Sequence, residues 1–274
     1  MTPSQLQLLK LLQSDKFTEA QLRSAVLLLR SAAAGEISEK RLALITRIGR
    51  RGGYVEDLFG TMATASWLNE TRFVAAYEAA RAASVWTQDI RWRIYTLMVA
   101  ADHGRRIEGN FVECGVDRGG TATAVLNYNG EDSFINRKFF LFDTFEGLVA
   151  EQMSDGEAQR DHFSSDRYPS VYEDVKQRFS SLPFVLPIKG AVPDSLAAYD
   201  GGPVAYLHID MNVALPECAA FEFFWPLLTK GAPVIFDDYG FPLHTEQREA
   251  LDITAKKLGT TIMMLPTGQG LTWR

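Results

Sequence analysis

The sequence predicts an α/β fold: a mostly parallel sheet with an antiparallel C-terminal hairpin, preceded by a helical extension. After residue 109, short apolar runs alternate with segments of helical periodicity, which is typical of βαβ units. The last two apolar runs are separated by the turn sequence TGQG at 267–270, which indicates a hairpin. The expected strands are 111–112, 139–142, 184–188, 204–209, 233–236, 262–265 and 271–273.

Helical periodicity fills the intervals between these strands. The clearest case has Pro216 at its start and Gly231 after its end, which are the residues favoured at those two positions. We expect helices at 121–126, 172–179, 217–228 and 245–257, with a short turn near 194–198.

The chain is expected to have three parts: a helical extension at 1–55, a helical lead-in and lid at 56–108, and the core at 109–274. Residues 1–51 carry nine Lys and Arg against four acids, which leaves −11 for the remainder. A solvated helical face explains this basic excess most simply. Alternatively, the basic segment docks on an acidic partner, on anionic lipid or on the rest of the chain. We expect the extension to serve for interaction or dimerisation, giving a homo-oligomer, or to form part of the lid.

Composition excludes several classes of protein. The 274 residues are 46% hydrophobic and 23% charged, which is ordinary for a globular protein, and the net charge of −6 argues against a nucleic-acid partner. No apolar run reaches the roughly 20 residues that cross a bilayer, and no signal peptide is visible. Two distant cysteines predict neither disulfides nor a zinc site. We therefore expect a cytoplasmic protein.

The segment FVECGVDRGG at 111–120 reads as a parallel strand, a tight turn and a helix with an uncapped N-terminus. Gly115 and Gly119 permit a close backbone approach, and the free N–H groups of such a helix suit an anion. Glu113 stands where a dinucleotide-binding turn has glycine, and a carboxylate there repels phosphate. S-adenosylmethionine fits instead, because it is cationic and carries one carboxylate. An ordinary glycine-containing turn is the alternative.

Each apolar run ends in a polar group, and ligands of such sheets bind at the carboxyl ends of the strands. Asp143 is placed to accept the two hydroxyls of a ribose. Lys189 and Gly190 end the next strand, beside the expected adenine position.

Three aspartates end two further strands. If these strands are neighbours, about 4.8 Å apart, then Asp210 converges with Asp237 and Asp238. Three converging carboxylates repel one another unless a cation lies between them, and oxygen ligands favour Mg²⁺ or Ca²⁺. Alternatively, Asp237 caps the following turn and Asp238 is solvated.

The motifs FVECGVDRGG, FLFDTFEGL, LHIDMN and IFDDYG, in this order over residues 109–274, resemble the macrocin O-methyltransferase family. Its members are class I, Rossmann-like S-adenosylmethionine-dependent enzymes that methylate sugar hydroxyls. The resemblance implies that Glu113 and Gly115 hold the methionine portion, with Gly119 nearby, and that Asp143 binds the ribose. It also implies Mg²⁺ at Asp210, Asp237 and Asp238. We expect Asp210 to contact the cofactor and to take part in catalysis as well.

The sequence departs from this family at the expected general base. Members usually carry a second aspartate two residues after the first metal ligand, where this chain has Asn212, and an amide cannot accept the proton. We take His244 as the substitute catalytic base. His208 reads as a core histidine, and His162 in the polar stretch 151–168, interpreted as a mobile lid, is a weaker candidate.

The first hypothesis is therefore a Mg²⁺-assisted, S-adenosylmethionine-dependent O-methyltransferase whose partner is a small sugar-containing acceptor. The second is a catalytically silent relative that binds a ligand or an active partner in a glycan or natural-product pathway, which Asn212 favours. A nicotinamide dehydrogenase is disfavoured by Glu113.

Overall fold

The computed structural model describes residues 63–159, 169–241 and 244–274, together with short pieces before residue 62. Most of the expected helical extension at 1–55, and His162 with most of the polar stretch 151–168, lie outside the described residues. The homo-oligomer expected of the N-terminal extension stays a prediction. No helix among the described residues is long and apolar enough to cross a membrane.

The chain divides into two compact units. The first comprises Met1–Glu70 and Trp86–Arg91, and the second comprises Thr71–Val85 and Trp92–Arg274. The expected division of the chain into parts 1–55, 56–108 and 109–274 stays a prediction. Helix α4 (Thr71–Ala82) belongs with the core because its buried face, which includes Phe73 and Tyr77, packs on helix α6.

The first unit contains a short antiparallel pair, β1 (Tyr54–Glu56) and β2 (Phe59–Thr61), with Glu56 opposite Phe59. The expected helix was wrong in this stretch. Tyr, Val and Phe favour strands, and a glycine at position 60 disfavours a helix interior. The 3₁₀ helix η1 (Ser66–Asn69) follows.

The second unit is built on a seven-stranded sheet in the order β5-β4-β3-β6-β7-β9-β8. The five strands from β5 to β7 are parallel, and β9 pairs antiparallel with both β7 and β8. This confirms the mostly parallel sheet with an antiparallel C-terminal hairpin. The strands are β3 (Asn110–Cys114), β4 (Phe139–Asp143), β5 (Val185–Lys189), β6 (Val204–Ile209), β7 (Pro233–Phe236), β8 (Met263–Met264) and β9 (Gly270–Trp273).

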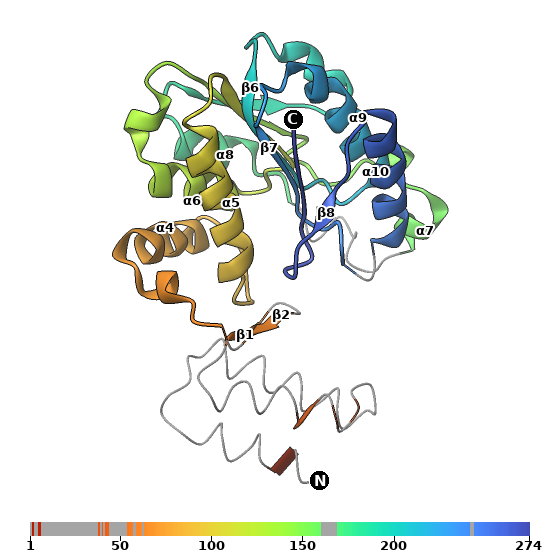
Figure 1. The fold of residues 1–274 in the computed structure, drawn as a ribbon. Helices are drawn as coiled ribbons and strands as arrows, with labels where there is room; N and C mark the ends of the chain where they lie inside the picture. Colours follow the sequence, from red (N-terminus) through yellow and green to blue (C-terminus); the bar gives the residue numbers. More distant parts are fainter. Residues whose placement is uncertain are drawn as a thin grey trace. The chain divides into compact units, whose positions relative to one another are not determined.

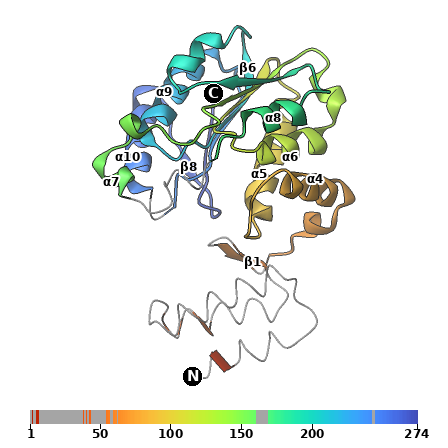
Figure 2. The ribbon, with the colours of Figure 1, turned by 180° about the vertical axis from the view of Figure 1, so that it is seen from behind.

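Helices cover both faces of this sheet. Figures 1 and 2 show α9 and α10 on one side and α5, α6 and α8 on the other. The helices are α5 (Arg91–Gly104), α6 (Gly120–Asn129), α7 (Asp155–Ala158), α8 (Tyr172–Arg178), α9 (Ala214–Phe224) and α10 (Thr245–Lys257). The short 3₁₀ helices are η2 (Glu131–Phe134), η3 (Ala150–Gln152), η6 (Asp194–Ala198) and η7 (Trp225–Leu227).

Helix α9 begins three residues earlier than expected, at Ala214. Pro216 therefore lies inside the first turn. The first-turn N–H groups have no acceptor within the helix, so a residue that lacks an N–H does no harm there.

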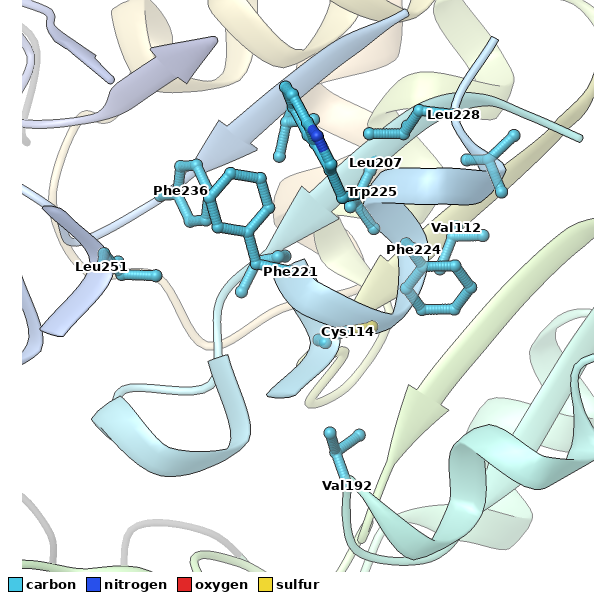
Figure 3. Close-up of a cluster of buried hydrophobic side chains, with 14 of the residues drawn as sticks. Val112, Cys114, Val192, Leu207, Phe221, Phe224, Trp225, Leu228, Phe236 and Leu251 are labelled. Carbon is cyan, nitrogen blue, oxygen red and sulfur yellow. The ribbon is translucent and has the colours of Figure 1, made fainter. Parts of the chain in front are cut away.

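The main core fills the space between the sheet and the α9–α10 side. Val112 and Leu207 come from the central strands, and Phe221 of α9 packs edge-on against Phe236 of β7 at 4.9 Å between ring centroids. Figure 3 shows these side chains together with Cys114. Cys114 is fully buried, as expected of a small core residue. This packing fixes where each strand ends.

Candidate active site

The strand order reverses between β3 and β6, because the chain runs from β3 outward to β5 and then returns to the other side of β3. In sheets of this kind the ligand crevice lies at this reversal, outside the carboxyl ends of the strands. Residues Glu113, Asp143, Lys189, Asp210 and Asp237 all lie at or just after the carboxyl ends of parallel strands.

The turn after β3 brings two strand ends into direct backbone contact. Gly115 has φ of 91°, and a Cβ built there would lie 1.8 Å from the carbonyl oxygen of Asp210. The Asp210 N–H donates to Cys114 O at 2.7 Å. Gly119, in the left-handed conformation, precedes α6, whose N-terminus has no side-chain cap. The tight turn and the uncapped helix are both confirmed.

Asp143 supports this turn from the neighbouring strand. Its Oδ2 accepts from the backbone N–H groups of Val116 at 2.6 Å and Asp117 at 2.9 Å. Its Oδ1 accepts from the N–H of Phe145 at 2.6 Å. The carboxylate thus holds the glycine turn in place, and its contact with a ribose stays a prediction.

Lys189 and Gly190 lie at the end of β5, next to β4. The side chain of Lys189 is exposed and forms an ion pair with Glu146 at 2.5 Å. The Gly190 N–H donates to Asp143 O at 2.9 Å, and its φ of 147° suits glycine. Both residues border the crevice, and their contact with an adenine stays a prediction.

Glu113 is fully buried and has protein partners. Its Oε1 accepts from the hydroxyl of Thr121 on α6, and its Oε2 lies 3.7 Å from His208 Nδ1. The predicted contact of Glu113 with the methionine portion is therefore not visible in this geometry and stays a prediction.

His208 lies between two carboxylates at the centre of the sheet. Its Nδ1 faces Glu113, and its Nε2 lies 3.9 Å from Asp237 Oδ1. Burial alone would lower the pKa of His208, but the two adjacent carboxylates raise it to about 10. His208 is buried in the core, as the sequence suggested, and its raised pKa favours the protonated imidazolium form.

Asp237 and Asp238 share a second cation, Arg93 of α5. The Nη2 of Arg93 donates to Asp237 Oδ2 and, at 3.0 Å, to Asp238 Oδ1. Gln269 of the C-terminal hairpin donates to Asp237 Oδ1 at 2.8 Å. Burial alone would raise the pKa of Asp237, but Arg93 and His208 outweigh it and hold this pKa below its usual value.

Asp210 follows β6, and β6 is the neighbour of β7, which precedes Asp237 and Asp238. This is the arrangement in which the three aspartates were expected to converge. Burial and then the charges of Asp237 and Asp238 raise the pKa of the Asp210 carboxyl well above its usual value. The three carboxylates therefore act on one another electrostatically.

The oxygens of this cluster do not form an open cage for Mg²⁺. Both oxygens of Asp237 already accept protein donors, and Arg93 bridges Asp237 to Asp238. Within the ranges that the structure describes, no group of three His, Cys, Asp or Glu side chains is arranged to hold a metal ion. Mg²⁺ requires near-octahedral oxygen ligation, so the donor set does not fit this ion. The magnesium site stays a prediction, against which the Arg93 contacts argue.

A buried network joins His244 to the loop after β6. His244 lies immediately before α10, and its Nδ1 is 2.6 Å from Gln247 Oε1. Gln247 Nε2 donates to Glu217 Oε2 at 2.6 Å. Glu217 Oε1 in turn accepts from the N–H groups of Met211 and Asn212 at 2.9 and 3.0 Å. The catalytic role of His244 stays a prediction; in this structure it supports the loop that follows Asp210.

Sequence reasoning missed most of these supporting residues. Arg93 lies 144 positions before Asp237, and nothing local marks it as the partner of a carboxylate. Gln269 was visible only as part of a turn. For Glu217 a signal existed, since a carboxylate on the buried side of an apolar helix requires polar partners.

The sheet order, the glycine turn and the carboxylates along one edge define a Rossmann-like class I methyltransferase fold. The chain belongs to the macrocin-O-methyltransferase (TylF) family, whose model matches residues 78–264, and is therefore a methyltransferase.

NovP and CalS11 are among the solved structures that share the fold. The O-methyltransferase NovP is 21% identical with a TM-score of 0.58, covering 66% of this chain and 79% of NovP. CalS11, a calicheamicin methyltransferase, is 16% identical with a TM-score of 0.57, covering 81% of this chain and 97% of CalS11. No curated protein sequence matches the chain.

Proposed function

We propose that this protein transfers a methyl group from S-adenosylmethionine to a hydroxyl of a sugar or of a glycosylated small molecule. The observation that carries the proposal is the uncapped N-terminus of α6 behind the Gly115–Gly119 turn, in a chain of the macrocin-O-methyltransferase family. The family supplies the reaction class and the turn supplies a place for the cofactor.

The residues of the turn suit a cofactor that carries a carboxylate and no phosphate. The free N–H groups and positive end of α6 attract a carboxylate. Asp143 fixes the turn, because its two oxygens accept from Val116 and Asp117 on one side and from Thr144 and Phe145 on the other. The sulfonium already supplies a good leaving group, so the main task of the protein is to align an acceptor hydroxyl with the methyl group. Because Arg93 occupies the Asp237–Asp238 pair, Mg²⁺ assistance is not part of this proposal.

Titration calorimetry with S-adenosylhomocysteine tests the cofactor. We expect the native chain to bind it, and Asp143→Asn to weaken binding at least about tenfold, since the turn loses a charged acceptor. Asp200→Asn is the matched control, because Asp200 is exposed and pairs with Lys138 at the surface. A native chain that gives no heat at saturating ligand contradicts the proposal.

The catalytically silent alternative rests on Asn212. Its φ of 62° is a conformation that Asn and Asp both tolerate, so Asn212→Asp restores the family's carboxylate without distorting the backbone. We expect the native chain to methylate at least one member of a panel of sugar nucleotides and glycosides, detected by mass spectrometry. If only Asn212→Asp shows transfer, the native chain is the silent relative.

A further inference from the structure

Arg93 is held by more contacts than a surface ion pair would provide. Besides its bonds to Asp237 and Asp238, its guanidinium lies over the ring of Phe241, 4.7 Å from the ring centroid. Gln269, which bonds to Asp237, also lies 3.4 Å from the backbone oxygen of Arg93. Only 14% of the Arg93 side chain is exposed. The Arg93 side chain is therefore held by two carboxylates and by an aromatic ring at the same time.

The place of Arg93 is built for a guanidinium. One nitrogen, Nη2, donates to both carboxylates while the planar face of the guanidinium stacks on the ring of Phe241, which a spherical ion cannot do. A divalent ion would have to displace this side chain and leave it buried without its carboxylates, at a large desolvation cost.

We propose that Arg93 is the resident cation of the Asp237–Asp238 pair and takes the place of a divalent ion there. The inference rests on the proposed function, since it concerns how this active-site edge is held. Arg93 is thereby a positioning residue. It joins α5 to the loop after β7 and to the C-terminal hairpin, and so fixes Asp237 and Asp238 beside Asp210. Methyl transfer to an accepted sugar is expected to persist in the presence of a chelator.

Mg²⁺ titration of the native chain is the first test. We expect no binding heat and no change in Tm at millimolar Mg²⁺. Measurable heat with a rise in Tm overturns the inference. S-adenosylhomocysteine titrated into the same samples separates the two proposals. If both Mg²⁺ and S-adenosylhomocysteine give binding heat, only the inference about Arg93 is contradicted. If neither gives heat, only the proposed cofactor is contradicted.

Substitutions of Arg93 test the role of its charge. Arg93→Met removes the cation that the two neighbouring carboxylates share, and we expect Tm to fall by about 10 °C. We expect millimolar Mg²⁺ to recover part of this loss, because the vacated place then suits an ion. Arg93→Lys keeps the charge and is expected to retain at least half of the lost stability, and it decides the question if Arg93→Met does not fold.

Arg106→Met is the matched control, since Arg106 pairs with Asp102 at the surface with 65% of its side chain exposed. We expect its Tm to change by at most about 2 °C. If Arg93→Met and Arg93→Lys lower Tm equally, and Mg²⁺ recovers none of the loss, the inference is overturned. The positive charge of Arg93 would then not be the source of its stabilising effect.

Discussion

Replacing Gly115 by alanine is expected to destabilise the core by about 4 kcal/mol or more, or to prevent it from folding. The new Cβ would lie 1.8 Å from the carbonyl oxygen of Asp210, and the φ of 91° is one that alanine rarely adopts. Neither backbone can retreat, because Asp210 N–H bonds to Cys114 O and Gly115 N–H bonds to Phe142 O. Chemical denaturation followed by circular dichroism measures the loss.

Gly130→Ala is the matched control for backbone conformation. Gly130 has φ of 76°, and a Cβ built there meets no atom within 4 Å. We expect a loss of about 1–3 kcal/mol, because a φ of 76° with a ψ of 153° is a conformation that essentially only glycine adopts. If Gly115→Ala and Gly130→Ala lose equal stability, the short distance from Gly115 to the carbonyl oxygen of Asp210 is not the reason that position 115 requires glycine.

Replacing Glu217 by alanine is the second change with a large expected effect. It leaves the part-buried backbone N–H groups of Met211 and Asn212 and the buried amide of Gln247 without their acceptor. Each unsatisfied buried donor costs about 1–3 kcal/mol, so we expect a loss of about 3 kcal/mol or more. Methyl transfer should fall too, because the loop after Asp210 loses its support. Denaturation and activity are measured on the same preparation.

Glu222→Ala is the control on the same helix. Glu222 pairs with Lys257 at the surface, and 41% of its side chain is exposed, so we expect a change within about 0.5 kcal/mol. A loss in Glu222→Ala equal to that in Glu217→Ala would show that the helix itself, rather than the buried network, is being measured.

The Glu217 carboxyl should also make the stability of the fold depend on pH. Burial raises its pKa to about 8, against hydrogen bonds from Gln247 and Met211 that lower it. The folded state therefore holds this proton more tightly than the unfolded chain. The stability that results is complete below the ordinary pKa of 4.5 and is lost as the pH rises through about 8. Glu217→Gln, which cannot ionise, is expected to lack this slope.

The carboxyl edge of the sheet was predictable because two simple rules combine there. A polar residue after an apolar run marks the end of a strand, and parallel strands place such ends at one edge. Asp143, Asp210 and Asp237 were located in this way, and the structure places all three at the carboxyl ends of parallel strands. Packing of β6 beside β7 then brought Asp210 next to Asp237 and Asp238.

The partners of these carboxylates could not be predicted, because they depend on tertiary packing. The sequence suggested ligands for Glu113 and a metal for Asp237, whereas the structure gives both carboxylates protein cations, His208 and Arg93. These cations come from a neighbouring strand and a distant helix. Strand and helix periodicity specify which face a residue occupies, but not which residue from another element meets it there.

The position of His208 has a consequence for any mutational study of this protein. One imidazolium lies between a carboxylate on β3 and a carboxylate after β7, so removing either negative charge alters the electrostatic environment that remains for the other. Energetic effects of substitutions at the two places will therefore not be additive, and a double-mutant cycle between them should give a coupling energy different from zero. Strand β6 thus links the two halves of the crevice thermodynamically.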